Sequence, residues 1–309
     1  MNAFMSQNFY FLVFSFNRGR FLDNCVRSIA EHVPDACIRI YDDDSDDPAT
    51  CDVLERLEAQ HEVVRARDLG ANSGRHGGLY ANMQAAVDAV PDSALFCCIQ
   101  DDMQIVRTIQ PDELAQWREH LVQRPDVAFL HPCFLKGSNR QRDAARTHFD
   151  PTTGYYVRKA EVRGAGVYYA DVMVSLGGRL EQKGWRFQTR ESDNEAQARA
   201  LFPPMEFLFA PFAMWLPSVP VYRGRQRTRA LQWAEHLSAC GFHPFNALSE
   251  EDAVRLKARE PACLPEAEAW LSLRQPGLPE PWRYDPFQGR NWLRHLDRLE
   301  RFWRARLGG

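Results

Sequence analysis

The chain has 309 residues, of which 45% are hydrophobic, and this is enough to bury one large core. Its net charge of −3 excludes a general attraction to nucleic acid, so any anion must be bound by a local patch. The eight cysteines form no CxxC pair and no metal-ligand spacing, which predicts free thiols in a reducing compartment. The apolar run 9–16 lacks the flanks of an export signal, and the apolar stretch 202–222 contains five prolines, which exclude an unbroken membrane-spanning helix. We therefore expect a soluble, cytoplasmic protein.

The first hundred residues alternate between strand and helix patterns, as in a parallel sheet. Apolar runs predict strands at 9–16, 37–41, 61–67 and 94–99, and helical stripes predict helices at 21–32, 48–58 and 79–90. Ligands of such sheets bind beyond the carboxyl ends of the strands. The polar segments at those ends should therefore face one crevice: residues 15–18, 42–45, 72–75 and 101–102.

The rest of the chain is less regular. A strand is predicted at 130–135, a hairpin from 154–162 and 166–173, and a helix at 192–201. From about residue 227 the pattern is mostly helical, with proline-rich breaks at 261–265 and 276–286.

Two strand ends are acidic, Asp42–Asp44 and Asp101–Asp102. Either cluster alone is most often a solvated turn. Two acidic clusters around a Gly/Asn loop favour a nucleotide-binding site, because a carboxylate after a strand can accept hydrogen bonds from the base and the ribose of a nucleotide. Paired carboxylates would repel a diphosphate unless Mg²⁺ or Mn²⁺ lies between them.

Four segments of this half resemble one known family. Phe14-Ser15-Phe16-Asn17-Arg18 and the helix after it are similar to the opening strand and "NR" turn of family 2 glycosyltransferases. Ile40–Asp46 resembles the "vDDgStD" strand end of that family, and Asn72-Ser73-Gly74…Asn82 resembles its "N.G…N.g" segment. Ile99–Asp102 falls where the family carries its DXD motif, although Gln100 replaces the first acid.

The resemblance implies the GT-A fold, a Rossmann-like, mixed and mostly parallel α/β sheet flanked by helices, with a C-terminal helical extension. It implies a donor-binding half at 1–103, an acceptor-binding half at 104–225 and the extension at 226–309. A nucleotide sugar, with a UDP-sugar favoured, would be bound by eight residues: Ser15, Asn17, Arg18, Asp42, Asp43, Asn72, Arg75 and Asp101. Asp102 would hold a divalent metal, Mn²⁺ or Mg²⁺, more weakly than an intact motif.

The family's catalytic base lies in an "ED.el..R" helix, which resembles Ser192-Asp193-Asn194-Glu195…Arg199. The resemblance makes Asp193 the base that takes the proton from an acceptor hydroxyl, with Ser192 in place of the usual Glu. The same letters also predict a capping box between Ser192 and Glu195, with Asp193 complementing the helix dipole. Both interpretations can hold at once, because a helix N-terminus keeps a carboxylate ionised.

Downstream, Gln226-Arg227-Thr228-Arg229-Ala230 resembles the QxxRW signature of processive synthases, with Ala230 in place of Trp. We interpret Arg227 and Arg229 as a basic loop near the diphosphate or the acceptor; a solvated charge run is the alternative. His236 and His243 are candidates for a third metal ligand by position only.

The C-terminal helix predicted at 287–307 is amphipathic, with Trp292, Leu296, Leu299 and Trp303 in one stripe. Residues 290–309 contain six arginines against Asp297 and Glu300. This pattern predicts either peripheral contact with the inner face of an anionic membrane, where a lipid-linked acceptor would lie, or a helix packed on its own domain.

The resemblance implies an inverting glycosyltransferase that acts on a glycan or lipid-linked acceptor, as in the synthesis of cell-surface polysaccharides or glycoconjugates. A GT-A module that binds a sugar without turnover is the alternative, favoured by Gln100 and Ser192. A sugar-nucleotide pyrophosphorylase is disfavoured, because its GxGxR opening loop is absent after the first strand.

Overall fold

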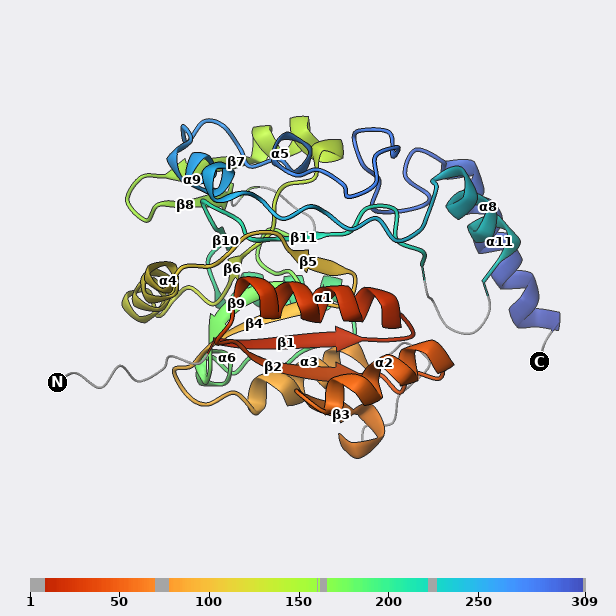
Figure 1. Ribbon diagram of the computed structural model, residues 1–309, viewed down its shortest axis with the longest axis horizontal. Coiled ribbons are helices and arrows are strands. Elements are labelled where there is room, and N and C mark those ends of the chain that lie inside the picture. The colour runs from red at the N-terminus through yellow and green to blue at the C-terminus, as the bar shows by residue number, and fades with distance from the viewer. Residues whose placement is uncertain (1–8, 70–77, 160, 162–165, 222–226, 308–309) are drawn as a thin grey trace.

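The computed structural model describes residues 9–69, 78–159, 161, 166–221 and 227–307. Its core is a nine-stranded mixed sheet in which β9 and β8 run against the other seven strands (Figure 1). The strand order is β3 (Glu62–Arg65), β2 (Cys37–Asp42), β1 (Phe9–Ser15), β4 (Leu95–Gln100), β9 (Met173–Leu176), β6 (Leu130–His131), β10 (Glu206–Phe207), β8 (Tyr155–Arg158) and β7 (Thr147–Asp150). The parallel order β3-β2-β1-β4 is the nucleotide-binding order of a Rossmann-like half. The predicted architecture, a mixed and mostly parallel α/β sheet flanked by helices, is confirmed.

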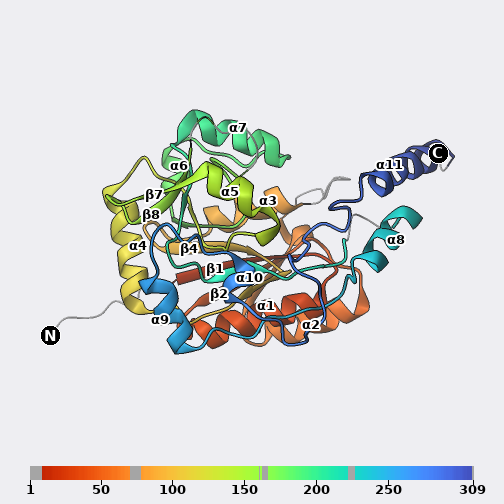
Figure 2. The ribbon, with the colours of Figure 1, turned by 90° about the horizontal axis from the view of Figure 1, so that it is seen from above.

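The apolar run of β1 is buried along its whole length, because helices cover both faces of the sheet. On one face its odd-numbered residues pack under α1 (Gly19–His32), α2 (Pro48–Glu58) and α4 (Pro111–Gln123). On the other face its even-numbered residues pack under α3 (Leu79–Asp88), α6 (Arg179–Gln182) and α7 (Glu191–Leu201). Figure 2 shows these two helical layers on either side of the strands.

The elements predicted in the first hundred residues are all present within a few residues, and α7 confirms the helix predicted at 192–201. The predicted hairpin of 154–162 with 166–173 is wrong. β8 pairs with β7 instead, while Met173 of β9 lies opposite Cys98 of β4. The residues of β9 are all buried, so this strand fills the centre of the sheet between β4 and β6. The strand predicted at 130–135 is reduced to β6, which has two residues.

The described part of the apolar stretch 202–222, residues 202–221, does not form a helix. It supplies β10 and β11 (Ala213–Trp215), and β11 pairs with β5 (Met103–Ile105), a strand that the sequence pattern did not predict. Among the described residues no helix has the length and apolar character needed to cross a membrane. The remaining short elements are α5 (Arg140–Arg146) and two 3₁₀ helices, η1 (Ala66–Leu69) and η2 (Gly137–Asn139).

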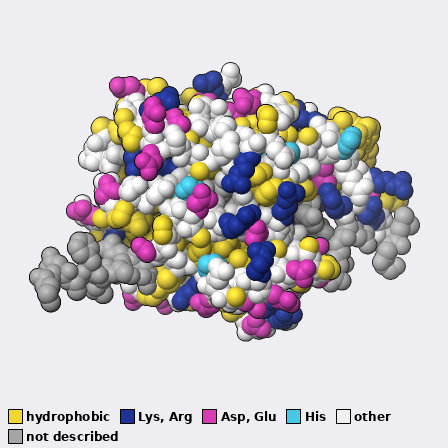
Figure 3. All heavy atoms as spheres, viewed as in Figure 1, with side chains coloured by type: hydrophobic (Ala, Val, Ile, Leu, Met, Phe, Trp, Pro, Cys, Tyr) yellow, Lys and Arg dark blue, Asp and Glu magenta, His cyan; other side chains and the backbone are white. Residues whose placement is uncertain are grey.

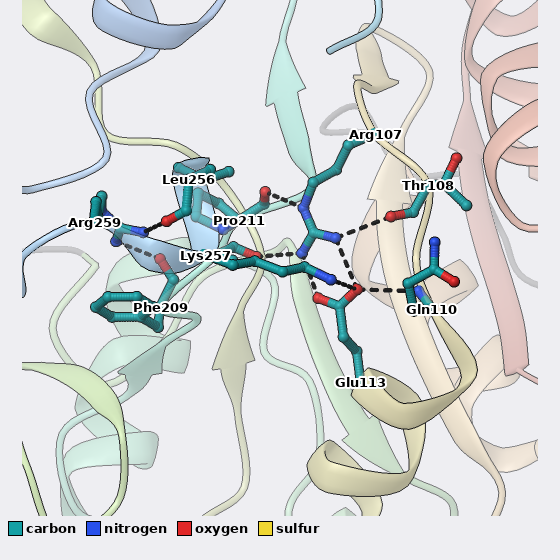
Figure 4. Close-up of polar contacts among 10 residues, drawn as sticks. Arg107, Thr108, Gln110, Glu113, Phe209, Pro211, Leu256, Lys257 and Arg259 are labelled. Atoms are coloured by element: carbon teal, nitrogen blue, oxygen red, sulfur yellow. Dashed lines mark hydrogen bonds and ion pairs between the residues drawn. The ribbon is translucent and has the colours of Figure 1, made fainter. Parts of the chain in front are cut away.

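The C-terminal region contains α8 (Arg229–Leu237), α9 (Glu250–Ala258), α10 (Ala267–Trp270) and α11 (Asn291–Leu307), joined by irregular chain. Its middle part packs on the sheet domain through a core that includes Phe245, Leu256 and Trp282. A buried polar network also fastens α9 to the domain (Figure 4): the fully buried Arg107 donates to Glu113 at 2.7 and 2.9 Å, and Lys257 of α9 donates to the same carboxylate at 2.8 Å. The predicted division of the chain at residues 103 and 225 remains a proposal.

Candidate functional site

The carboxyl ends of β1, β2 and β4 lie side by side and border a cavity of about 200 Å³. Phe14, Tyr41 and Leu79 form its apolar walls, and the rings of Phe14 and Tyr41 are 5.9 Å apart. Its polar lining comes from Ser15, Arg18, Asp43, Asn82, Gln100 and Asp101. Four of the predicted donor-site residues, Ser15, Arg18, Asp43 and Asp101, therefore meet at one cavity. Among the described residues, the buried hydroxyl of Ser15 has no hydrogen-bond partner.

Arg18 joins the two acids that follow β4. Its Nη1 donates to Asp101 Oδ1 at 3.2 Å and to Asp102 Oδ2 at 2.7 Å, and its Nη2 donates to the carbonyl of Pro220 at 3.4 Å. Burial lowers the pKa of Arg18, but the two carboxylates outweigh this effect and raise the pKa above its ordinary value. Burial raises the pKa of Asp101, against the opposing effect of Arg18. The cluster is therefore a charged unit held largely away from water.

Asp101 and Asp102 differ in what remains available to a ligand. Asp101 is 4% exposed, and its second oxygen accepts from the backbone N–H of Phe16 at 3.1 Å. In the described part of the chain, Oδ1 of Asp102 is buried and has no hydrogen-bond partner. A carboxylate oxygen in this condition suits a cation or a ligand donor. The same residues contain no cluster of three or more Asp, Glu, His or Cys side chains that could hold a metal alone. A cation at Asp102 would thus need oxygens from a bound phosphate or from water.

Asp42 and Asn17 serve the architecture of the site. Asp42 is 1% exposed, and its carboxylate accepts from the N–H and the hydroxyl of Ser45 at 2.7 and 2.6 Å. Asn17 has a positive φ of 51°, and its side chain donates to Asp46 and accepts from the N–H groups of Asp46 and Asp47. These bonds tie the loop after β1 to the loop after β2. Burial raises the pKa of Asp42 despite the bonds from Ser45.

Asp43 anchors the start of α3. Both of its oxygens accept from the N–H of Gly78 at 2.8 Å, and a Cβ at Gly78 would collide with Oδ1 of Asp43. A larger side chain at position 78 would therefore displace the Asp43 carboxylate from this contact. Burial raises the pKa of Asp43, and the bond from Gly78 opposes this shift. The predicted site residues Asn72 and Arg75 lie in the segment 70–77, outside the described residues.

Asp193 lies in the first turn of α7 and is exposed. Ser192 Oγ is 3.3 Å from its carboxylate. The predicted capping box is wrong, because α7 begins after Arg190, and Glu195 faces a different segment. Glu195 accepts from the backbone N–H of Tyr168 and Tyr169 at 3.0–3.2 Å.

Asp171 is a carboxylate that the sequence analysis missed. It lies two residues before β9, and extending the β4–β9 register by two residues beyond the pair of Cys98 and Met173 places it opposite Gln100. Burial raises the pKa of Asp171 to about 6, although the hydroxyls of Tyr169 and Tyr80 oppose the shift. Its Oδ1 is buried and lacks a hydrogen-bond partner in the described ranges. The chain that leads into β9 therefore brings an acidic side chain, Asp171, next to the neutral Gln100.

Lys136 is a second missed residue. Its ammonium lies 4.4 Å from the ring centre of Trp215 and 4.7 Å from that of Tyr284. Burial lowers its pKa, and the nearby Asp102 opposes the shift. In the sequence Lys136 is a single lysine after a short apolar run, and no pattern around it indicates that it is buried near Asp102.

The predicted basic loop is described only from Arg227. Arg227 forms an ion pair with Glu235, and both line a cavity of about 330 Å³ with Pro220. Arg229 opens α8, is exposed, and its backbone N–H donates to Glu300. The carbonyl of Pro220, which accepts from Arg18, connects this region to the strand-end acids. His243 lies 2.9 Å from the carbonyl of Ala239, and His236 lines the cavity with Arg227.

A larger cavity, about 690 Å³, lies elsewhere, along α4, β8 and α9. Figure 1 places α4 at the amino end of β1, away from the carboxyl ends of the strands. Several of the charged groups along this cavity are paired within the protein: Glu113 with Arg107 and Lys257, and His120 with Glu206. We assign the site to the smaller strand-end cavity, because ligands of such sheets bind there and because the partnerless carboxylate oxygen of Asp102 belongs to its acid–arginine cluster.

Comparisons with known proteins are weak in sequence. No family model and no curated protein matches the chain. Among solved structures it is similar to S. aureus TarS, with 12% identity and a TM-score of 0.43 over 67% of this chain and 36% of that one. It is also similar to the mannosyltransferase PcManGT from Pyrobaculum calidifontis, solved with GDP-Man and Mn²⁺, with 10% identity and a TM-score of 0.41 over 98% of this chain and 76% of that one. At these scores neither structure assigns a substrate or a residue role to this chain.

Proposed function

We propose that the chain is an inverting glycosyltransferase that moves a sugar from a nucleotide-diphosphate sugar, with a UDP-sugar favoured, to an acceptor hydroxyl. The observation that supports this most is the strand-end cluster, in which Arg18 bridges two acids and Asp102 keeps one buried oxygen without a partner. An ion pair with a purely structural role would leave no buried acceptor unsatisfied.

The cavity suits the base end of the donor. Phe14 and Tyr41 offer aromatic walls, while Ser15 and Asn82 supply polar atoms that lack partners among the described residues. A pocket with apolar walls and a few fixed polar groups is typical of a nucleotide base site. The diphosphate would then extend toward Arg18 and the acids after β4.

The diphosphate needs more positive charge than Arg18 provides, because Arg18 already faces two carboxylates. A divalent cation, Mn²⁺ or Mg²⁺, would be held by Asp102 through Oδ1 and would neutralise charge on the departing nucleotide. Further positive charge in this region comes from Lys136, which is close enough to Asp102 to feel its charge, and from Arg227, which lines a cavity together with Pro220. Asp101 holds the guanidinium of Arg18 in place.

For the transfer step we propose Asp193 as the base. Its carboxylate would accept the proton of the acceptor hydroxyl while the acceptor oxygen bonds to the anomeric carbon. The bond from that carbon to the phosphate oxygen breaks on the opposite face, which inverts the configuration. Asp171, opposite Gln100, would accept hydrogen bonds from hydroxyls of the transferred sugar.

The acceptor is proposed to be a glycan or a lipid-linked sugar, reached at the inner face of the membrane by a cytoplasmic enzyme. A catalytically inactive GT-A module is the second candidate, and one observation favours it: Gln100 is neutral and Arg18 already compensates both acids of the motif. Hydrolysis of the donor in the presence of Mn²⁺ separates the two, since only the enzyme releases nucleotide diphosphate.

Thermal unfolding with a panel of nucleotide diphosphates, with and without Mn²⁺, tests the proposed function. A ligand at ten times its Kd stabilises the folded state by roughly 1.4 kcal/mol, which raises the Tm of a protein of this size by about 2 °C. We expect one base to be preferred and Mn²⁺ to increase its effect. A panel in which no nucleotide diphosphate raises the Tm would contradict the proposal.

A further inference from the structure

Two C-terminal helices carry an exposed apolar cluster. Of the eleven large hydrophobic residues that are exposed in the described part of the chain, seven belong to α8 and α11. We call this surface the α8–α11 face; it consists of Trp233, Leu237, Trp292, Leu296, Leu299, Phe302 and Trp303. The rings of Trp233 and Trp292 are 5.1 Å apart, so the two helices share one apolar surface. Exposed apolar clusters of this kind mark interaction sites.

Apart from the contact of Trp292 with Trp233, the apolar stripe of α11 is largely exposed. Trp292, Leu299 and Trp303 are 51%, 55% and 56% exposed, although they form the apolar side of an amphipathic helix. α11 contacts α8 through a different side, on which Leu293 is fully buried. The predicted packing of this helix on its own chain is thus present, against α8, while its apolar stripe stays largely exposed. The exposed stripe is therefore available for contact with a partner.

The two acids of α11 are occupied by α8. Asp297 accepts from the hydroxyl of Thr228 at 2.6 Å, and Glu300 accepts from the N–H groups of Arg229 and Ala230 at the start of α8. These contacts turn both carboxylates inward, against the positive end of a helix dipole. The negative charge of α11 is thereby removed from its outer sides.

Of the five arginines of α11, three pair with acids: Arg294 with Asp285, Arg301 with Asp297 and Arg304 with Glu300. Arg298 is exposed and has no ion-pair partner among the described residues, and Arg306 lies over the ring of Phe302 at 4.2 Å. Five arginines fall within the seventeen residues of the helix, against the two inward acids. Figure 3 shows hydrophobic and basic side chains next to each other over these helices, and Figures 1 and 2 show both helices at one end of the molecule. Tryptophan, leucine and arginine on one amphipathic surface suit the interface of an anionic bilayer.

We propose that the α8–α11 face docks on an anionic lipid bilayer, with its tryptophans at the headgroup level and its arginines on lipid phosphates. This specifies the surface of the membrane contact proposed above. It stands on the geometry of the two helices, so it can succeed or fail independently of the transfer reaction.

The test is sedimentation of the full chain with vesicles. We expect binding to vesicles of equal parts phosphatidylcholine and phosphatidylglycerol, little binding to pure phosphatidylcholine, and weakening by salt. The double variant Trp292→Ser/Trp303→Ser should bind at least about tenfold more weakly. Arg298→Glu should weaken binding to the anionic vesicles alone.

The control is Val122→Ser/Val254→Ser, which removes two exposed apolar residues, 58% and 65% exposed, from α4 and α9. It should bind as the wild type does. All variants change exposed positions, so their Tm should match the wild type. The proposal is overturned if the wild type ignores anionic vesicles or if the tryptophan variant binds them unchanged. Self-association of the wild type that the tryptophan variant abolishes, without vesicle binding, would overturn it in favour of a contact between two copies.

Discussion

Replacing Asp102 by asparagine separates the two roles of the acid pair after β4. Asparagine keeps the shape of the side chain but removes the charge from the oxygen that has no partner among the described residues. Arg18 keeps its bonds to Asp101 and to the carbonyl of Pro220. The loss of folding free energy should therefore be about 1–3 kcal/mol, below the 3–5 kcal/mol of a buried pair broken completely.

The effect on ligand binding should be larger than the effect on folding. A contact to a charged group contributes about 1.5–3 kcal/mol, which corresponds to roughly a tenfold to 150-fold change in affinity. We expect Asp102→Asn to lose most of the gain that Mn²⁺ gives to nucleotide diphosphate binding. Since Gln100 already removes one charged ligand, that gain should be modest in the wild type. Calorimetric titration with UDP and GDP, in Mn²⁺ and in EDTA, measures it.

Asp101→Asn is the matched control. Asp101 accepts from Phe16 and Arg18, so its replacement should lower stability while the Mn²⁺ effect persists. If Asp102→Asn gains as much affinity from Mn²⁺ as the wild type does, Asp102 is not the cation ligand and the reasoning from its partnerless oxygen is refuted.

Three further predictions concern the acceptor side. Asp193→Asn should slow transfer by about a hundredfold to ten-thousandfold, whereas Glu191→Gln on the same exposed turn should not; equal losses would remove Asp193 as the base. Glu195→Gln should lower the free energy of unfolding by about 1–3 kcal/mol, because it weakens two bonds from backbone N–H groups, and an unchanged denaturant midpoint would speak against this. The pKa of Asp171 is raised to about 6 by burial, above an unfolded value of about 4, so the folded state binds the proton more tightly. Wild-type stability relative to Asp171→Asn should therefore fall as the pH rises from about 4 to about 6, and a Tm difference that does not change with pH would contradict it.

The parallel half of the fold could be predicted because its signals are local. β1, β2 and β4 are continuous apolar runs that end in polar residues, and such runs indicate buried strands whose ends meet at one edge. The meeting of Ser15, Asp43 and Asp101 followed from that pattern. The role of each polar residue in the site could not be predicted in this way. The bonds of Asn17 to the loop after β2, for example, depend on a positive φ that no residue pattern indicates.

The rest depended on which distant segments become neighbours. Arg18 meets Asp101 and Asp102 across more than eighty residues, and the partner of β4 is β9. The alternating pattern favoured a hairpin between 154–162 and 166–173. The residues of β9 are instead buried on both faces of the strand, which places β9 in the centre of the sheet. Because β9 pairs with β4, Asp171 comes to lie opposite Gln100, and no pattern in the sequence indicates that it is a site residue. Likewise, Glu195 matched a capping box by spacing, while its actual contact is with a segment 26 and 27 residues earlier.

The release of nucleotide diphosphate from nucleotide sugars tests the central claim most directly. The wild type, incubated with UDP- and GDP-sugars in Mn²⁺, should release the nucleotide from at least one donor, and Asp102→Asn should release it at least about tenfold more slowly. Release that is equal in the wild type and the variant, or no release and no binding with any donor, would contradict the assignment of a glycosyltransferase site to the ends of β1, β2 and β4.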